Sequence, residues 1–281
     1  MQTIRVALRA LGRAVLYLGL IIWGVYSILP FLWSFSASFR PLNEIFRYPP
    51  AFLPKALDLN NYVNLLTKQH FPRWYLNSVG LATASTVIVV FFSSLGGFAF
   101  AKYTFRLKSV LFTIVIGSMI IPFHLILTPL YAEMNALKWL NTYWALIIPW
   151  MTPAFGIFMM RQYMVTIPSE LLDAARIDGC SEFRIYGQIV FPLARPALGA
   201  LAIYQFMFSW NSFLWPMVVL RDTRLFPLTV GLATLLGQVV AESIDYGQIM
   251  AGAFLASLPI IVLFLFMQRQ FISGLTLGSV K

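Results

Sequence analysis

The chain has little charge and few of the side chains that catalyse reactions. Only 11% of its 281 residues are charged and 59% are hydrophobic, which is more apolar surface than a soluble fold buries. Its single cysteine, Cys180, excludes an internal disulfide. The two histidines, His70 and His124, are isolated and fit no zinc-protease motif, and no Asp or Glu lies in the long apolar segments. These absences disfavour a membrane-embedded enzyme and a proton-coupled carrier.

The glycine-rich loop that binds nucleotide phosphates is also missing. No Gly-x-x-x-x-Gly-Lys-Ser/Thr occurs, and the nearest segment, 97–102, lacks the second glycine. We therefore expect a non-enzymatic chain that binds no ATP and no other cofactor or metal.

Six apolar segments are each long enough to cross the hydrocarbon core of a bilayer, which takes about 20 residues. None contains Asp, Glu, Lys or Arg, and one charge at the bilayer centre costs about 2.5–3.5 kcal/mol. The sequence predicts an all-α membrane protein, a single integral domain over residues 1–281, whose six transmembrane helices cover about residues 14–39, 76–101, 109–130, 142–160, 197–220 and 250–267.

The basic residues predict which side of the membrane each connection faces. Twelve of the 20 Lys and Arg residues lie before the first segment, after the last, in the second connection, or in and beside 161–195. By the positive-inside rule both termini and the loop 161–195 are cytoplasmic, and the loops 40–74, 131–141 and 221–248 are extracytoplasmic. The net charge of +10 is then explained by topology and by attraction to membrane lipid, with no nucleic-acid partner. The first apolar run is too long for a signal peptide, so we expect a retained helix in the cell membrane.

A polar stretch, 168–192, separates two apolar segments and carries a spaced motif. It contains Asp173-Ala174-Ala175, then Gly179, and after nine residues Ile189-Val190-Phe191-Pro192. Ser169 is predicted to cap a short helix that Gly179 ends, and Ser181 to start a second one. The two alanines would leave a flat surface, and Asp173 would offer a charge to a basic partner.

This stretch resembles the EAA loop of the permeases of ATP-driven importers, with Asp173 where the motif has Glu and Phe191 where it has Leu. In that family the loop docks into a groove on a separate ATPase subunit. The resemblance implies a type I ABC importer permease fold with a cytoplasmic coupling-helix loop. The alternative, an amphipathic loop on the membrane surface, does not require this spacing. The docking residues implied by the resemblance are Asp173, Ala174, Ala175, Asp178, Gly179, Phe183, Ile189 and Pro192.

Other segments resemble the second permease of maltose-type sugar importers. They are Asn60-Asn61-Tyr62, Asn77-Ser78, Thr142-Tyr143-Trp144-Ala145, Ser209 to Pro216, and the C-terminal residues 268–281. This resemblance implies three partners: a homologous first permease, a homodimeric ABC ATPase that holds ATP and Mg²⁺, and an extracytoplasmic sugar-binding protein. In that family the outer loop before the last helix reaches into the cleft of the binding protein, and the resemblance assigns this role to 221–248. Gly237 and Gly247 would give the loop flexibility, and the alternative is a passive connecting loop.

Three residues are candidates for the substrate pathway. Trp210 and Asn211 interrupt the fifth apolar segment with an aromatic face and an amide, although a structural hydrogen bond by Asn211 is an equal alternative. His124 is the only ionisable group within a predicted span, and a neutral histidine bonded to a neighbouring helix is its alternative role. We expect a sugar substrate. The alternative, glycerol phosphate or another polyol derivative, would favour Arg or Lys near the pathway, and the spans contain none.

The second span contains a patch of small residues, Ser93, Ser94, Gly96 and Gly97, which predicts close packing against another helix.

Overall fold

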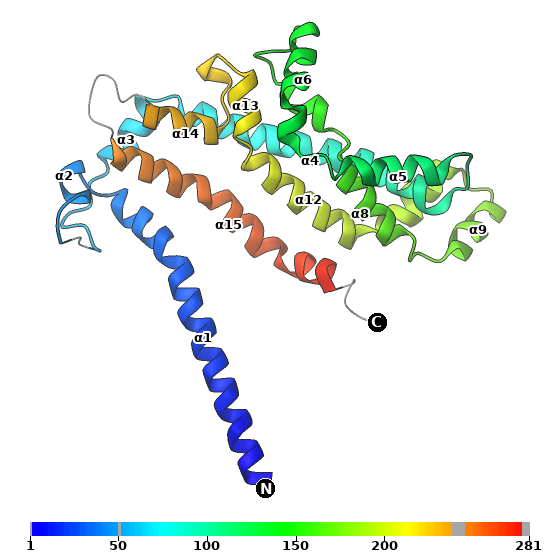
Figure 1. The fold of residues 1–281 in the computed structure, drawn as a ribbon, viewed down its shortest axis with the longest axis horizontal. Helices are drawn as coiled ribbons and strands as arrows, with labels where there is room; N and C mark the ends of the chain where they lie inside the picture. Colours follow the sequence, from blue (N-terminus) through cyan, green and yellow to red (C-terminus); the bar gives the residue numbers. More distant parts are fainter. Residues whose placement is uncertain (1, 50–51, 238–244, 277–281) are drawn as a thin grey trace. The chain divides into compact units, whose positions relative to one another are not determined.

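The computed structural model describes residues 2–49, 52–237 and 245–276, and side chains for 10–49, 52–237 and 245–266. Two predictions therefore concern residues whose side chains are not described: the resemblance of the segment 268–281 and part of the loop 221–248. Every secondary-structure element in these ranges is helical (Figure 1). The elements are α1 (Gln2–Ala37), α2 (Leu42–Ile45), α3 (Asn60–Thr67), α4 (Phe71–Lys102), α5 (Lys108–Ser118), α6 (Phe123–Ala136), α7 (Trp144–Ile147), η1 (Ile148–Trp150), α8 (Ala154–Met164), α9 (Ser169–Ile177), α10 (Glu182–Ile185), η2 (Tyr186–Val190), α11 (Phe191–Leu193), α12 (Arg195–Trp210), α13 (Leu214–Val219), η3 (Thr223–Leu225), α14 (Leu228–Gly237) and α15 (Tyr246–Thr276).

Four described helices are long and apolar enough to cross a membrane, and the number rises to six if each of two bent helix pairs counts as one span. The pair α5 and α6 bends by 101° at residues 119–122, inside the segment 109–130 that was predicted as one span. Pro122 has an extended backbone there and occupies the cap position before α6. The predicted segment 197–220 is also interrupted, because α12 ends at Trp210 and α13 begins at Leu214. The single integral domain with six crossings stays a prediction.

The chain divides into two compact units, and the larger one comprises His70–Thr234 and Leu258–Lys281. In this unit α4 packs against α8 and α12 (Figure 1). A Cβ atom added to Gly97 would lie 2.5 Å from Cβ of Met160, and one added to Gly156 would lie 2.3 Å from Oγ of Ser93. These contacts confirm the close helix packing predicted from the small residues of the second span.

The core of the larger unit extends from these helices into the polar stretch. Leu172 of α9 and Ile185 of α10 are buried in the same cluster as Met160 and Met164 of α8. The hydroxyls of Tyr186 and Ser94 lie 2.5 Å apart, and Lys102 donates to the carbonyl oxygen of Ile167. The short helices of the polar stretch are thus held against the C-terminal end of α4.

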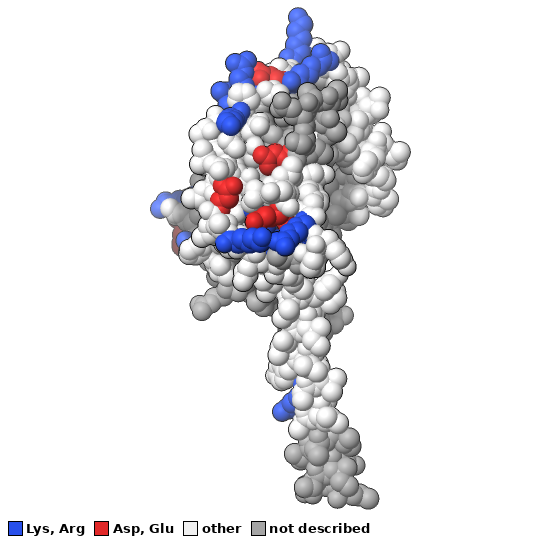
Figure 2. Space-filling model, turned by 90° about the vertical axis from the view of Figure 1, so that its left-hand side faces the viewer, with Lys and Arg blue, Asp and Glu red and all other residues white. Residues whose placement is uncertain are grey.

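The smaller unit comprises Met1–Gln69 and Leu235–Ser257. Along Ala10–Ala37 the side chains of α1 are apolar and mostly exposed, and Figure 2 shows this helix almost without charged groups. Asn61 is buried and donates to the carbonyl oxygens of Ser38 and Arg40 at 2.9 and 2.8 Å. Gly247, predicted to be flexible, is instead the second residue of α15, where an added Cβ would lie 2.5 Å from the Asn61 side chain.

Candidate functional site

The polar stretch folds as the short helices α9 and α10 joined by a tight turn. Helix α9 begins at Ser169 with Pro168 in the cap position, so the prediction that Ser169 is the cap was wrong by one residue. Pro168 has the extended backbone of a capping residue and its successor already enters the helix. Ser181 does occupy the cap position of α10, although its side chain makes no capping hydrogen bond.

Gly179 ends α9 as predicted. Its φ of 77° is in the left-handed region that favours glycine. The Gly179 N–H donates to the Arg176 carbonyl at 3.0 Å and the Cys180 N–H to the Ala175 carbonyl at 2.9 Å, which is the hydrogen-bond pair of a Schellman motif. The motif reverses the chain so that α10 follows directly.

The eight predicted docking residues fall into two groups. Ala175 is buried, and Ile189 and Pro192 are half-buried, with Ile189 packed on the core cluster. These three therefore hold the loop on the rest of the chain. The other five are exposed to solvent, namely Asp173, Ala174, Asp178, Gly179 and Phe183.

Two exposed apolar side chains stand out on this surface. Ile177 is 87% exposed and Phe183 is 84% exposed, on opposite sides of the Gly179 turn. Sequence reasoning named Phe183 and missed Ile177. Its position was readable, because a short helix that buries Leu172 and Ala175 leaves Ile177 off the buried stripe. We call Ile177, Phe183, Ala174 and Asp178 the loop surface.

A charged network also links α9, α10 and the end of α4. Arg176 contacts Oδ1 of Asp173 at 2.7 Å and Oε1 of Glu182 at 2.8 Å, and the Tyr103 hydroxyl donates to Glu182. Burial, together with the bond to Glu182, raises the pKa of Tyr103 to about 12, and the hydrogen bonds from Arg176 lower the pKa of Glu182. Asp173, expected to offer its charge to a partner, is already paired with Arg176.

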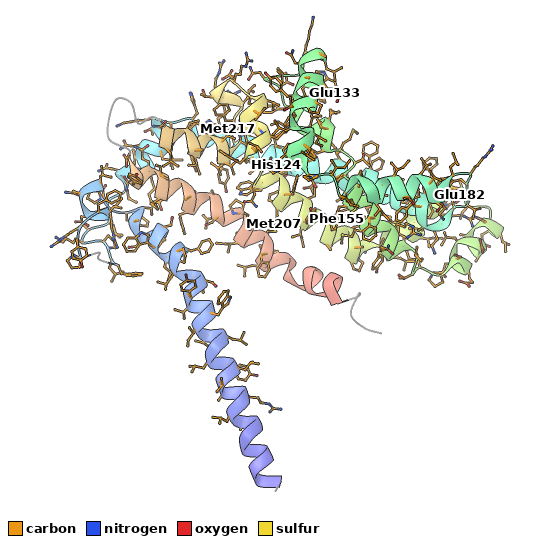
Figure 3. The ribbon with its side chains drawn as sticks, viewed as in Figure 1. His124, Glu133, Phe155, Glu182, Met207 and Met217 are labelled. Carbon is orange, nitrogen blue, oxygen red and sulfur yellow. The ribbon has the colours of Figure 1, made fainter. Side chains whose placement is uncertain are left out.

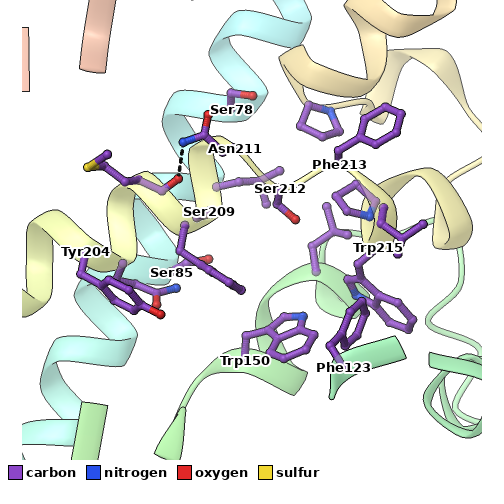
Figure 4. A pocket seen from close by; sticks show the side chains of 18 of the residues that line it. Ser78, Ser85, Phe123, Trp150, Tyr204, Ser209, Asn211, Ser212, Phe213 and Trp215 are labelled. Carbon is purple, nitrogen blue, oxygen red and sulfur yellow. Dashed lines mark hydrogen bonds between the residues drawn. The ribbon is translucent and has the colours of Figure 1, made fainter. Parts of the chain in front are cut away.

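A cavity of about 680 Å³ lies in the larger unit, along the first half of α4 and the last turns of α12. Figure 4 shows Tyr204 and Ser85 towards one end and Trp215 towards the other. None of the described residues that line it is Asp, Glu, Lys or Arg. The lining residues are Ser78, Leu81, Ser85, Phe123, His124, Leu146, Trp150, Tyr204, Gln205, Met207, Phe208, Ser209, Asn211, Ser212, Phe213, Leu214, Trp215, Pro216 and Pro227.

The three predicted pathway residues lie differently around this cavity. His124 and Asn211 line it, and the Asn211 amide donates to the Met207 carbonyl at 2.8 Å, a structural bond that closes the end of α12. Trp210 is buried outside the lining, with its ring 5.8 Å from those of Phe206 and Tyr75. Figure 3 shows His124 at the start of α6, well away from Glu182 of α10. Gln205 and Ser85, which sequence reasoning missed, are signalled only as polar residues within apolar segments.

The segment after α13 is fixed to the first turns of α4. The Asn77 amide donates to the carbonyls of Arg224 and Phe226, each at 2.9 Å. Ser78 accepts from the Leu228 N–H at 2.7 Å. The Trp74 indole donates to the Thr223 carbonyl at 2.8 Å. These bonds hold the segment 223–228 against the start of α4.

Comparison with known proteins identifies the family. Residues 93–276 match the model of the binding-protein-dependent transport system inner membrane component, and the chain belongs to this family of multi-pass membrane permeases. It is 41% identical to the arabinooligosaccharides transport system permease protein AraQ of Halalkalibacterium halodurans, over 91% of each chain. It is 34% identical to the lactose transport system permease protein LacG of Rhizobium radiobacter over the full length of both, and 32% identical to the sn-glycerol-3-phosphate transport system permease protein UgpE of Salmonella typhi over 91% of this chain and 93% of that one.

The fold is also that of a solved importer. A chain of a bacterial ABC transporter involved in the import of the acidic polysaccharide alginate superposes with a TM-score of 0.82, at 24% identity, over 92% of this chain and 97% of that one. This likeness confirms the predicted ABC importer permease fold.

Proposed function

We propose that this chain is the permease subunit through which a binding-protein-dependent importer moves a sugar or oligosaccharide, driven by a separate ATPase dimer. The observation that carries the proposal is the loop surface. Two large apolar side chains are almost fully exposed on a segment whose other face is fixed in the core. Exposed apolar groups on a rigid support favour a protein partner over bulk water. The family membership makes an ATPase the natural partner.

The cavity supports a sugar as substrate. Aromatic rings and uncharged polar groups line it together, and this is the combination that stacks on sugar rings and bonds their hydroxyls. The relatives named for arabinooligosaccharides and lactose support the same class. The relative named for glycerol 3-phosphate favours a polyol phosphate as the second candidate. That dianion would have to find its cationic partners on the other permease.

The remaining partners follow from the same proposal. A homologous permease completes the pathway, a solute-binding protein delivers the sugar, and ATP and Mg²⁺ bind the ATPase dimer, so this chain binds neither. The loop 161–195 and both termini face the cytoplasm, as the basic residues indicate. The fixed segment 221–228 then faces the binding protein.

The test is a reconstituted importer. This chain, its partner permease, the ATPase and the binding protein are placed in proteoliposomes, and ATP-dependent uptake of radiolabelled lactose, arabinotriose and glycerol 3-phosphate is measured. Phe183→Ser and Ile177→Ser should each reduce copurification of the ATPase and ATP-driven uptake about tenfold or more. Because both side chains are exposed, the thermal stability of the permease pair should not change.

The matched control is Leu53→Ser, which removes an equally exposed apolar side chain (80% exposed) from the opposite predicted face. It should leave ATPase copurification intact. Undiminished copurification in both loop variants would overturn the coupling role, and uptake of glycerol 3-phosphate alone would favour the second candidate.

A further inference from the structure

Two mostly buried polar residues have side-chain polar atoms that open into the cavity and are not among the fully enclosed unpaired atoms of the described chain. Gln205 of α12 is 3% exposed and Ser85 of α4 is 6% exposed, and both line the cavity. Within the part of the chain that the structure describes, neither the Gln205 amide nor the Ser85 hydroxyl makes a hydrogen bond. Two other polar residues of the lining already make side-chain hydrogen bonds, since Ser78 accepts from Leu228 and Asn211 donates to Met207.

An unpartnered amide is unfavourable at this place. Ser85 lies near the middle of α4 and Gln205 within α12, and both helices belong to segments apolar enough to cross a membrane. A donor or acceptor cut off from every partner costs about 1–3 kcal/mol, so an amide that opens into this cavity is satisfied by whatever occupies it, water or a ligand. An apolar residue of the same size would avoid this cost. The amide therefore requires a partner that enters the cavity.

The chemistry around the amide specifies that partner. A glutamine amide presents one acceptor and two donors, which suits a neighbouring pair of hydroxyl groups, each of which both donates and accepts. The aromatic rings of Trp150 and Tyr204 line the same cavity, and the described lining contains no charged residue. An anionic ligand would be left without a counter-charge there, so the cavity favours a neutral polyhydroxylated ring.

We propose that Gln205, assisted by Ser85, binds hydroxyl groups of a neutral sugar during its passage, so that this chain itself contributes a polar subsite that selects against anionic sugars. The inference rests on the proposed sugar-import function. It adds two details to that function: the residue that recognises the substrate, and the absence of charge on that substrate.

The experiment uses the complete importer in proteoliposomes with radiolabelled lactose and arabinotriose. Gln205→Met keeps the length of the side chain and removes its donors and acceptor, so it should lower kcat/KM for uptake about tenfold, the loss of one or two neutral hydrogen bonds. Gln205→Asn shortens the amide and should give an intermediate loss. Ser85→Ala should lower kcat/KM by a smaller factor.

The decisive measurement repeats the assay with monodeoxy derivatives of the sugar that the wild type takes up. At least one deoxy sugar should be transported several-fold less well by the wild type and equally well by Gln205→Met, because the same hydrogen bond is already absent. A merely structural role for the amide would not produce this coupling. Thr86→Val is the control, since Thr86 neighbours Ser85 but its hydroxyl already bonds the Ala82 carbonyl at 2.7 Å.

The outcomes separate the two proposals. If the wild type transports sugar and Gln205→Met transports it with unchanged kcat/KM, the subsite is wrong and the import function stands. The subsite is also wrong if removing any hydroxyl of the sugar lowers kcat/KM for uptake by the same factor in the wild type and in Gln205→Met. That result would indicate that water or the partner permease bonds the amide. If the wild type transports no sugar, both proposals fail.

Discussion

Arg176 reaches across the Gly179 turn to Glu182, with Nε 2.8 Å from Oε1 and Nη2 3.2 Å from Oε2. This two-point contact joins the last turn of α9 to the first turn of α10. The Tyr103 hydroxyl binds the same carboxylate, and Tyr103 follows directly on the last residue of α4. A single carboxylate thus links both helices of the loop to the longest described helix of the larger unit.

Removing this carboxylate should reduce the coupling of ATP hydrolysis to uptake more than it reduces the stability of the permease. Glu182→Ala is expected to reduce ATP-driven uptake about three- to tenfold, because α9 and α10 lose their shared contact with Tyr103. The melting temperature should change little, since partly exposed ion pairs contribute about 1 kcal/mol or less. Uptake by proteoliposomes and thermal melting in detergent measure the two effects.

The chain offers a matched control in the pair Arg224–Asp222, whose side chains lie 2.9 Å apart outside the loop. Arg224→Ala deletes a similar exposed pair and should leave ATPase copurification unchanged. Equal copurification by Glu182→Ala and Arg224→Ala, with equal uptake, would contradict a coupling role for the network.

Gly179→Ala should impair coupling through the backbone alone. No atom lies within 4 Å of the added Cβ, so the only penalty is the left-handed φ of 77°, which costs an L residue about 1–2 kcal/mol. The turn should shift, and ATP-driven uptake should fall severalfold. Gly179→Asn should restore part of it, because asparagine tolerates this conformation.

Gly187→Ala provides the comparison within the same stretch. Its added Cβ also meets no atom within 4 Å, and its φ is not positive. It should transport like the wild type. Equal losses for Gly179→Ala, Gly179→Asn and Gly187→Ala would show that the turn conformation is not what matters.

Low pH should destabilise the packing of α9 and α10, because it protonates the Glu182 carboxylate. Hydrogen bonds from Arg176 lower the pKa of Glu182 below its usual value in the folded chain. The stabilisation is therefore fully present above the unfolded pKa of about 4.3 and is lost as the pH falls through the folded pKa. We expect the loop to lose this stabilisation, and the amides of α9 and α10 to lose protection from exchange, only below about pH 4 in the wild type. Glu182→Gln should show a weaker dependence, and identical pH profiles would refute the assignment.

Replacing either of two glycines of α4 by alanine should change the stability of the larger unit differently. Gly97→Ala places a Cβ 2.5 Å from Met160 Cβ and 2.9 Å from the Arg161 backbone nitrogen, so it should destabilise the larger unit by about 1–3 kcal/mol. Gly80→Ala meets no atom within 4 Å and should be neutral or slightly stabilising. Melting of the detergent-solubilised protein distinguishes them, and similar melting temperatures would mean that α4 and α8 do not pack this closely.

The sequence predicted most of the structure of the loop 161–195 but not which of its charged side chains pair with one another. Gly179 was predicted to end a helix because glycine adopts the left-handed conformation at low cost, and this is a local property. The burial of Ala175 and the pairing of Arg176 with Glu182 depend on where α8 and α10 lie, which spacing along the chain does not specify. For the same reason His124 and Asn211 were found at the cavity, whereas Trp210 packs behind it.

By itself, the sequence determined that the chain is helical and belongs in a membrane, because long uncharged apolar segments are stable nowhere else. It also determined the family, through the spacing of Asp173-Ala174-Ala175, Gly179 and Pro192. Only the tertiary structure decided which face of α9 and α10 is buried, which leaves Ile177 and Phe183 exposed, and that Gln205 and Ser85 open into one cavity. Exposure and convergence arise from contacts between residues far apart in the chain, and helical periodicity alone does not specify those contacts.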